Sequence, residues 1–273
     1  MTAELVSVIV PVLRLQRNLG ERARHLFRRA RDLKDLVANL RDNITIPYEL
    51  IVVCNNPHER ELLDFVRQSP HINKYCINST NVGVPRAWNM GAMLAEGEYL
   101  CFSNDDVEVG PGVLEALTQV LKENPDAGEV GPRGGRWEGD RGGERLGLER
   151  VEEVDEVSGF FFVLKRKVFE EVGGFEVAYT PALFEEIDMS FRVRQRGYRC
   201  LVVPRLNIRH HASYGVSDNE GSISFFNRTI SKQELHDRNS RIFTEKWGGM
   251  LEKRRDQMQG PEHTERTTAP DED

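Results

Sequence analysis

Two clusters of carboxylates in this 273-residue sequence could take part in chemistry, one at residues 105–106 and one at residues 185–188. Asp105 and Asp106 follow the amide Asn104 and the apolar run 99–102, which predicts a buried strand. Adjacent carboxylates at a strand end can hold a hard divalent cation, and such a cation can neutralise a diphosphate. Paired acids in a loop are often only solvated turn residues, so the position at a strand end is what favours a ligand site.

The second cluster, Glu185, Glu186 and Asp188, stands at the beginning of a predicted helix. Acids in the first turn of a helix interact favourably with the helix dipole, so capping is the simpler explanation. Capping does not account for the glycine- and phenylalanine-rich segments 159–162 and 173–175 upstream. The cluster is therefore kept as a candidate functional site.

Further polar residues lie at or beyond the ends of other predicted strands. Pro11 stands at the end of the first strand and Asn55 after the second, while His210 and His211 follow a later one. In an open parallel sheet, ligands bind beyond the carboxyl ends of the strands. A neutral imidazole can complete a metal site, although a histidine pair on a loop is more often part of the surface.

Strand-like and helix-like patterns alternate through the first half of the chain, and these elements must position the candidate residues. The expected strands are 6–12, 48–53, 74–77 and 98–102, and the expected helices lie at 26–40, around 62–66, at 85–97 and at 111–123. Strands separated by helices of this length are joined by right-handed crossovers. The fold class is therefore α/β, with a mostly parallel, Rossmann-like central sheet flanked by helices.

The second half has a different pattern. Seven glycines and four arginines within residues 131–147 predict a long loop, of the kind that often closes over a ligand. A strand, a helix and a second strand are expected after it, at 160–164, 184–196 and 199–203. A last helix is expected to end at Gly248 and Gly249, and the polar segment 251–273 is expected to be a disordered tail.

Composition and charge argue against several classes of protein. The formal net charge is −7 and no run of Lys and Arg marks a nucleic-acid groove, so nucleic acid is not an expected partner. No transmembrane segment is expected, because no long apolar stretch occurs. The cysteines are widely spaced, as buried reduced thiols are: Cys54, Cys76, Cys101 and Cys200. A cytoplasmic location is expected, with peripheral contact at the inner face of the membrane left open.

An ordered series of short motifs resembles the family-two glycosyltransferases with the GT-A fold, particularly their rhamnosyltransferase-like branch. The motifs follow the family's order at residues 6–11, 49–56, 81–83, 89–91, 95–100, 102–107, 158–159, 173–175, 185–188, 210 and 246–248. Each motif alone is weak, whereas the ordered set is specific. The resemblance implies one GT-A domain over residues 1–250, with a nucleotide-binding half at about 1–125 and an acceptor-side half at about 126–250.

The resemblance also assigns roles to single residues. Asp106 matches the last acid of the family's metal-binding signature, and His210 matches a histidine that is often a metal ligand. Glu186 matches the base that takes the acceptor proton, and Asp188 is its main competitor for a catalytic role. Nucleotide-sugar binding is implied for Pro11, Val12, Asn55, Asn81, Gly83, Asn89, Asn104 and Asp105.

Three positions depart from the family pattern. Asn104 stands where the family often has an aspartate, which makes Asp105 and Asp106 the stronger candidates for binding the cation. Asn55 stands where an aspartate usually accepts the imino hydrogen of the base; an amide oxygen can accept the same bond without charge assistance. Glu186 replaces the usual aspartate and reaches one methylene further.

Together these roles predict a metal-dependent, inverting glycosyltransferase that uses Mn²⁺ or Mg²⁺. It would move a sugar from a nucleoside-diphosphate sugar to a carbohydrate or lipid-linked acceptor hydroxyl, in polysaccharide or glycolipid assembly. Two alternatives stay open. A sugar-1-phosphate nucleotidyltransferase would need a glycine-rich basic signature after the first strand, and residues 13–18 contain no glycine run. A catalytically silent sugar-nucleotide-binding protein is suggested by Asn55 and Asn104.

Overall fold

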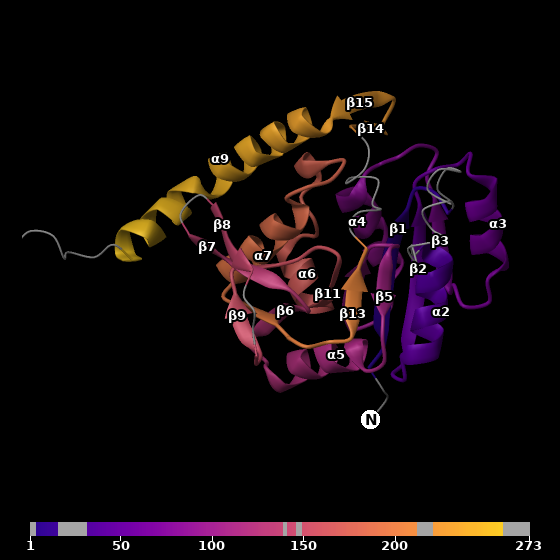
Figure 1. The fold of residues 1–273 in the computed structure, drawn as a ribbon, viewed down its shortest axis with the longest axis horizontal. Coiled ribbons are helices and arrows are strands. Elements are labelled where there is room, and N and C mark those ends of the chain that lie inside the picture. The colour runs from indigo at the N-terminus through magenta and orange to yellow at the C-terminus, as the bar shows by residue number, and fades with distance from the viewer. Residues whose placement is uncertain (1–3, 16–31, 139–140, 146–148, 212–220, 259–273) are drawn as a thin grey trace, which may run out of the picture.

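A computed structural model describes residues 4–15, 32–138, 141–145, 149–211 and 221–258 of the chain. Its central feature is an eight-stranded sheet with the order β3-β2-β1-β4-β11-β6-β12-β9 (Figure 1). The strands of this sheet are β1 (Val6–Val12), β2 (Tyr48–Cys54), β3 (Lys74–Ile77), β4 (Tyr99–Ser103), β6 (Ala127–Gly131), β9 (Glu152–Val154), β11 (Phe161–Lys165) and β12 (Arg199–Val202).

The first half forms the parallel sheet that the alternating pattern predicts. Strands β3, β2, β1 and β4 pair in parallel, whereas β11 runs antiparallel to both β4 and β6. The direction of strand addition reverses between β1 and β4, and such a switch point opens a crevice at the carboxyl ends of the strands. The sequence of the first half therefore places a ligand site beside Pro11, Val12 and residues 104–106.

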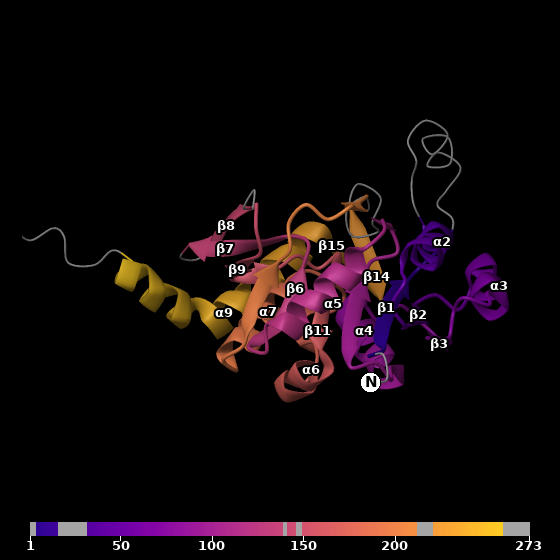
Figure 2. The same cartoon turned by 90° about the horizontal axis from the view of Figure 1, so that it is seen from below.

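Helices cover both faces of the sheet, as Figure 2 shows from below. On one face the even-numbered valines of β1 pack against α2, α3 and α5, and on the other Ile9 packs with α4, α6 and α7. The helices are α2 (Leu33–Asn43), α3 (Arg60–Gln68), α4 (Val84–Leu94), α5 (Val113–Glu123), α6 (Arg166–Val172) and α7 (Glu185–Gln195), with a 3-10 turn η1 (Val177–Tyr179). The part of the helix expected at residues 26–31 lies outside the described residues.

The prediction of a long loop at residues 131–147 is wrong for the described part of that segment. Strand β7 (Gly134–Glu138) pairs with β8 (Arg141–Arg145) and with β10 (Glu156–Val157) in a three-stranded sheet. A Cβ on Gly134 would lie 2.3 Å from the carbonyl oxygen of Glu156. This glycine therefore permits close approach of two backbones, as glycines in strands commonly do. Residues 139–140 and 146–148 lie outside the described residues.

The last helix does not end at Gly248 and Gly249. Helix α9 (Lys232–Met258) continues through both glycines and past the expected boundary at residue 250. Trp247 and Leu251, on either side of the pair, are buried in one aromatic cluster with Tyr179 and Phe191. Burial of these flanking side chains outweighs the cost of glycine in a helix, about 1 kcal/mol per residue. Residues 259–273 of the expected tail lie outside the described residues.

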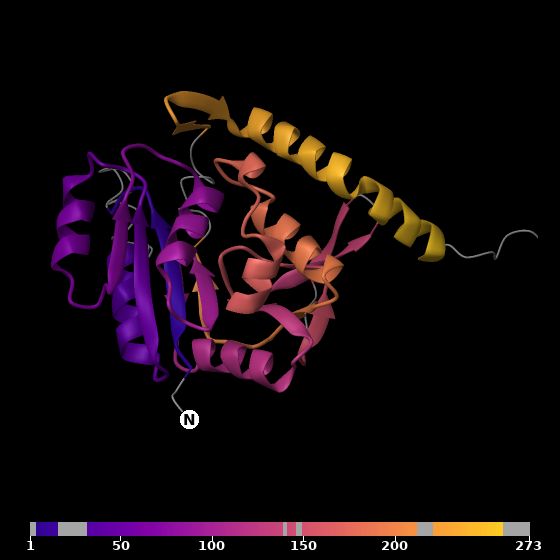
Figure 3. The same ribbon diagram turned by 180° about the vertical axis from the view of Figure 1, so that it is seen from behind.

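Two short sheets complete the fold. Strand β5 (Val107–Val109) pairs with β13 (Ile208–His210), and β14 (Ser222–Phe225) forms a hairpin with β15 (Arg228–Ser231). Figures 1 and 3 show α9 leading away from this hairpin along one side of the molecule. No helix in the described part of the chain is both long and apolar enough to cross a membrane.

Candidate active site

A cavity of about 120 Å³ lies at the switch point between β1 and β4. It brings together seven of the eight residues for which nucleotide-sugar binding is expected, along with Asp106. The described residues that line it are Pro11, Val12, Leu13, Arg14, Asn55, Asn81, Gly83, Val84, Asn104, Asp105, Asp106, Pro181, Ala182 and Ile223. We call it the first cavity.

The orientation of the Asn55 amide is fixed by two hydrogen bonds. Its Oδ1 accepts a bond of 2.9 Å from Nδ2 of Asn78, and its Nδ2 donates one of 3.4 Å to the carbonyl of Gly83. Gly83 has φ +81°, and a Cβ there would lie 2.7 Å from the backbone of Pro181. Glycine is required at this turn both by its conformation and by the close neighbour. Asn78 is a partner that the sequence analysis missed.

Asn81 ties the first cavity to the β14–β15 hairpin, far away in sequence. Its Oδ1 accepts a bond of 2.9 Å from the N–H of Gly83, and its Nδ2 donates one of 2.9 Å to the carbonyl of Ser224. The N–H of Phe226 donates to the carbonyl of Asn81 at 3.1 Å. Ile223 of the hairpin thereby forms part of the cavity wall. No motif in the sequence indicated this wall.

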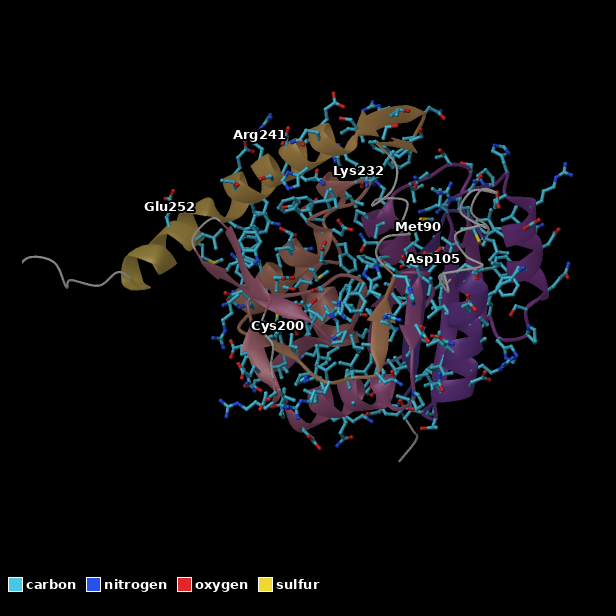
Figure 4. All side chains as sticks on the ribbon, in the orientation of Figure 1. Met90, Asp105, Cys200, Lys232, Arg241 and Glu252 are labelled. Carbon is cyan, nitrogen blue, oxygen red and sulfur yellow. The ribbon has the colours of Figure 1, made fainter. Side chains whose placement is uncertain are left out.

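Asp106 and His210 meet across the β5–β13 ladder. Oδ1 of Asp106 lies 3.3 Å from Nε2 of His210, which also lies 3.3 Å from Nδ2 of Asn104. The Asp106 side chain is buried and lines the first cavity. Asp105, labelled in Figure 4, lies in the turn between β4 and β5 and lines the first cavity as well. The ladder pairs His210 with Val107, so the strand register brings the two residues together.

These residues fit a divalent cation in type and position. A carboxylate suits both Mn²⁺ and Mg²⁺, and an imidazole suits the transition metal Mn²⁺ better than Mg²⁺. Mg²⁺ commonly takes one or two protein carboxylates and completes its coordination with phosphate oxygens and water. Within the described residues, no group of three or more His, Cys, Asp or Glu side chains is arranged to hold a metal by itself. A bound diphosphate would therefore have to supply part of the coordination.

A second cavity, of about 480 Å³, adjoins the first, and the two share Val84, Asn104 and Ala182. Its described lining also includes Trp88, Arg133, Glu156, Ser158, Gly159, Phe160, Leu183, Glu185, Glu186, Ile187 and His210. The two predicted clusters of carboxylates thus lie in adjoining cavities, with His210 on the wall of the second and its partner Asp106 on the wall of the first.

Glu185 and Glu186 begin helix α7 in the wall of the second cavity. Burial raises the pKa of Glu185 well above its usual range, and the neighbouring charge of Glu186 raises it further. Burial also raises the pKa of Glu186, while hydrogen bonds from the backbone N–H groups at the helix start oppose the shift. A carboxylate with a raised pKa is a stronger base, so Glu186 is suited to accept a proton. Gly159 leaves room for it, because a Cβ there would lie 2.8 Å from Cγ of Glu186.

Asp188 is not among the described residues that line either cavity. Its buried carboxylate lies 2.7 Å from Nε of Arg192 and 2.7 Å from Nζ of Lys246, and it accepts a bond of 2.9 Å from the indole of Trp247. Tyr179 donates a further bond of 3.4 Å. These contacts join α7 to α9, so Asp188 braces the two helices against each other.

Asn89 likewise does not line either cavity in the described structure. Its Nδ2 donates a bond of 2.9 Å to the carbonyl of Phe175, and its Oδ1 accepts one of 2.8 Å from the N–H of Phe175. A Cβ on Gly174 would lie 2.8 Å from this Oδ1. Asn89 thus fixes the glycine turn at 173–175 against α4, which accounts for both motifs in structural terms.

The sequence also gave no sign of how α9 supports the cavity walls. Asn239, which is fully buried, donates through Nδ2 to the carbonyls of Tyr179, Ala182 and Leu183 at 2.8–3.1 Å. Ala182 lines both cavities. The one sequence signal for this contact is an asparagine on the apolar face of a predicted helix. That signal indicates burial of Asn239 but does not indicate which residues it contacts.

Comparison with known sequences establishes the family. The family model described as Glycosyl transferase family 2 matches residues 26–173, more than half of the chain. The chain belongs to glycosyl transferase family 2. Its relatives include an uncharacterized protein of Sinorhizobium fredii, 26% identical over 213 residues that cover 67% of this chain and 23% of the relative.

A second relative is the N-acetylglucosaminyl-diphospho-decaprenol L-rhamnosyltransferase of Mycobacterium tuberculosis. It is 24% identical over 156 residues, which cover 46% of this chain and 50% of the relative. The matches therefore span half or less of the length of these two relatives.

Solved structures show the same fold. GalNAc-T7, solved with UDP, GalNAc and Mn²⁺, superposes with a TM-score of 0.60 at 14% identity, covering 77% of this chain and 44% of that one. The mannosyltransferase PcManGT from Pyrobaculum calidifontis, solved with GDP-Man and Mn²⁺, gives 0.50 at 17% identity, covering 73% and 54%. The chain has the GT-A fold, as its sequence motifs predict.

Proposed function

We propose that this glycosyltransferase moves a sugar from a nucleoside-diphosphate sugar to an acceptor hydroxyl in a single, inverting, metal-dependent displacement. One observation carries the proposal: Asp106 lines the first cavity, Glu186 lines the adjoining second cavity, and His210 on the wall of the second cavity contacts Asp106. Support comes also from similar folds solved with UDP or GDP-Man and Mn²⁺. A carbohydrate or lipid-linked acceptor, as in polysaccharide or glycolipid assembly, is part of the proposal.

The first cavity would hold the donor. Asn55 would face the base, with its Oδ1 placed by Asn78 to accept an imino hydrogen. Asp106 and His210, with Asp105 nearby, would hold the Mn²⁺ or Mg²⁺. The cation supplies positive charge to the diphosphate that leaves when the anomeric carbon–oxygen bond breaks.

Glu186 would act on the acceptor in the second cavity. An alcohol is a poor nucleophile at neutral pH, so a base must remove its proton as the new bond forms. The Glu186 carboxylate accepts that proton while the acceptor oxygen attacks the anomeric carbon from the face opposite the diphosphate. One displacement of this kind inverts the anomeric configuration, and general-base assistance contributes about 10²–10⁴-fold.

The test measures nucleotide release from uridine, thymidine and guanosine diphosphate sugars, with and without Mn²⁺, for wild type and Asp106→Asn. Asparagine is the better substitution because Asp106 is buried and a smaller residue would leave a cavity. We expect metal-dependent release by wild type and none by Asp106→Asn, with both proteins folded. A protein that binds the sugar nucleotides but forms no free nucleoside diphosphate from them would be catalytically silent. A protein that makes pyrophosphate from a sugar 1-phosphate and a nucleoside triphosphate would be a nucleotidyltransferase.

A further inference from the structure

Arg133 is a charged residue of the second cavity to which neither the family motifs nor the proposed mechanism assigns a role. It is the single Lys or Arg side chain among the described residues that line this cavity, which also carries the carboxylates Glu156, Glu185 and Glu186. No ion pair joins Arg133 to any of the carboxylates that the structure describes. An exposed arginine that lines a cavity without such a partner is available to bind an anion.

The local backbone fixes where this side chain starts. Strand β6 ends at Gly131, the next residue Pro132 is buried, and the carbonyl of Arg133 accepts a bond of 2.9 Å from the N–H of Ser158. Ser158 itself lines the second cavity. Arg133 is therefore held at the cavity wall before the chain enters β7.

The ring of Phe160 sets the direction of the Arg133 side chain. The guanidinium carbon lies 5.5 Å from the centre of this ring. The imidazole of His210 stacks on the same ring, with centroids 4.8 Å apart and an interplanar angle of 6°. Arg133, Phe160 and His210 all line the second cavity, and His210 contacts Asp106 of the adjoining first cavity.

We propose that Arg133 binds the terminal phosphate of the nucleoside diphosphate at the junction of the two cavities. A guanidinium offers paired N–H donors that match phosphate oxygens, and its charge would stabilise the negative charge that grows on the leaving group. The four carboxylates Asp105, Asp106, Glu185 and Glu186 near this junction make an added cation useful there. This inference rests on the proposed function, since it takes the first cavity as the donor site.

The experiment compares dissociation constants for nucleoside di- and monophosphates in the presence of Mn²⁺. Wild type is first titrated with uridine, thymidine and guanosine diphosphates, and the tightest of these is used with its own monophosphate. The variants are Arg133→Ala, Arg133→Lys and the control Arg136→Ala. Arg136 is three residues further along, on β7, and its guanidinium lies 3.4 Å from the carboxylate of Glu152. Arg136 is not among the described residues that line either cavity.

We expect Arg133→Ala to weaken the diphosphate about 10- to 100-fold, as loss of a hydrogen bond to a charged group does, and to leave the monophosphate unchanged. Arg133→Lys should fall between wild type and Arg133→Ala, because it keeps the charge and loses the paired donors. Arg136→Ala should match wild type.

Two results would overturn the inference while leaving the donor site in place. Equal loss of both nucleotides in Arg133→Ala would mean that the residue supports the cavity structurally. No loss of the diphosphate would mean that Arg133 serves the acceptor side or the neighbouring carboxylates. If wild type binds none of the three diphosphates, the proposed function itself fails, and that outcome is distinguishable from the other two.

Discussion

Glu186 and Asp188 stand two residues apart in one helix, yet their surroundings differ completely. Glu186 faces the second cavity, whereas Asp188 is buried against Arg192, Lys246 and Trp247. Positions i and i+2 of a helix point to different faces, so the two carboxylates cannot share one task. The sequence indicated that the cluster was functional, but only the contacts with α9 separate the two roles.

We expect Glu186→Gln to keep nucleotide and metal affinity and to lose about 10²–10⁴-fold in transfer rate, because it preserves shape while removing the base. Asp188→Asn should instead lower the free energy of unfolding by about 3 kcal/mol, since it leaves buried cationic partners without their carboxylate. Turnover, nucleotide affinity and urea unfolding are measured for both variants. Normal turnover by Glu186→Gln, together with a folded, nucleotide-binding and inactive Asp188→Asn, would make Asp188 the base.

Gly159 offers a second way to disturb the same base without changing it. A Cβ at this position would lie 2.8 Å from Cγ and 2.9 Å from Cβ of Glu186, so an alanine must push the carboxylate aside. We expect Gly159→Ala to lower the transfer rate about 10- to 100-fold, as small displacements of catalytic groups do, with nucleotide affinity intact. Gly249→Ala is the matched control, because a Cβ there meets no described atom within 4 Å. Equal rates for Gly159→Ala and wild type would show that Glu186 does not need its present position.

At the scale of elements, strand β6 carries a buried acid that the mechanism does not use. Glu129 is fully buried, and its Oε2 accepts a contact of 3.2 Å from the thiol of Cys200 on β12. Burial raises the pKa of Glu129 to about 8 from a usual 4.5. Between these values the folded protein keeps a proton that the unfolded chain has released, so stability must fall as pH rises.

We expect the free energy of unfolding of wild type to decrease between pH 5 and pH 8 by up to about 1.4 kcal/mol per pH unit from Glu129 alone. Glu129→Gln, which resembles the protonated acid, should remove this slope and be the more stable protein at pH 8. Urea unfolding at several pH values measures both effects. The exposed Glu123 at the end of α5 provides the control substitution to Gln. Parallel stability curves for wild type and Glu129→Gln would contradict the assignment.

The elements of the first half could be predicted closely because local patterns determine them. The runs of β1, β2 and β4 are buried on both faces, and Pro85 in the first turn of α4 is favourable at a helix start. In the second half the same reasoning failed where distant contacts decide the structure. Gly134 of β7 permits close approach of two strands, and the cost of the two glycines in α9 is outweighed by burial of Trp247 and Leu251. Neither effect is visible in a local window of sequence.

At the scale of the whole molecule, the order of motifs predicted where the site lies but not that it consists of two adjoining cavities. The sequence placed Asn55 and Asp106 beyond strand ends and Glu186 at a helix start, and the structure brings the first two to one cavity and Glu186 to its neighbour. The walls where the cavities meet are built from segments far apart in the chain, since Val84, Asn104 and Ala182 line both cavities. Residue types alone cannot predict such a partition.

Because α9 is near the end of the chain, some residues of the site obtain their supporting contacts later in translation than others. The strands β1 to β4 and their helices are complete by about residue 125, and they carry Asn55, Asn104 and Asp106. The helix that bears Glu186 acquires its partners Lys246 and Trp247, and the loop at 179–183 acquires Asn239, only after some fifty or sixty further residues have been translated. Because domains made on the ribosome fold from the N-terminus onward, strands β1 to β4 can take shape while the cavity walls at residues 179–183 and 186 still wait for α9. A nascent chain arrested before residue 239 would thus be able to form β1 to β4 and still lack the contacts from α9 that support Ala182 and the helix of Glu186.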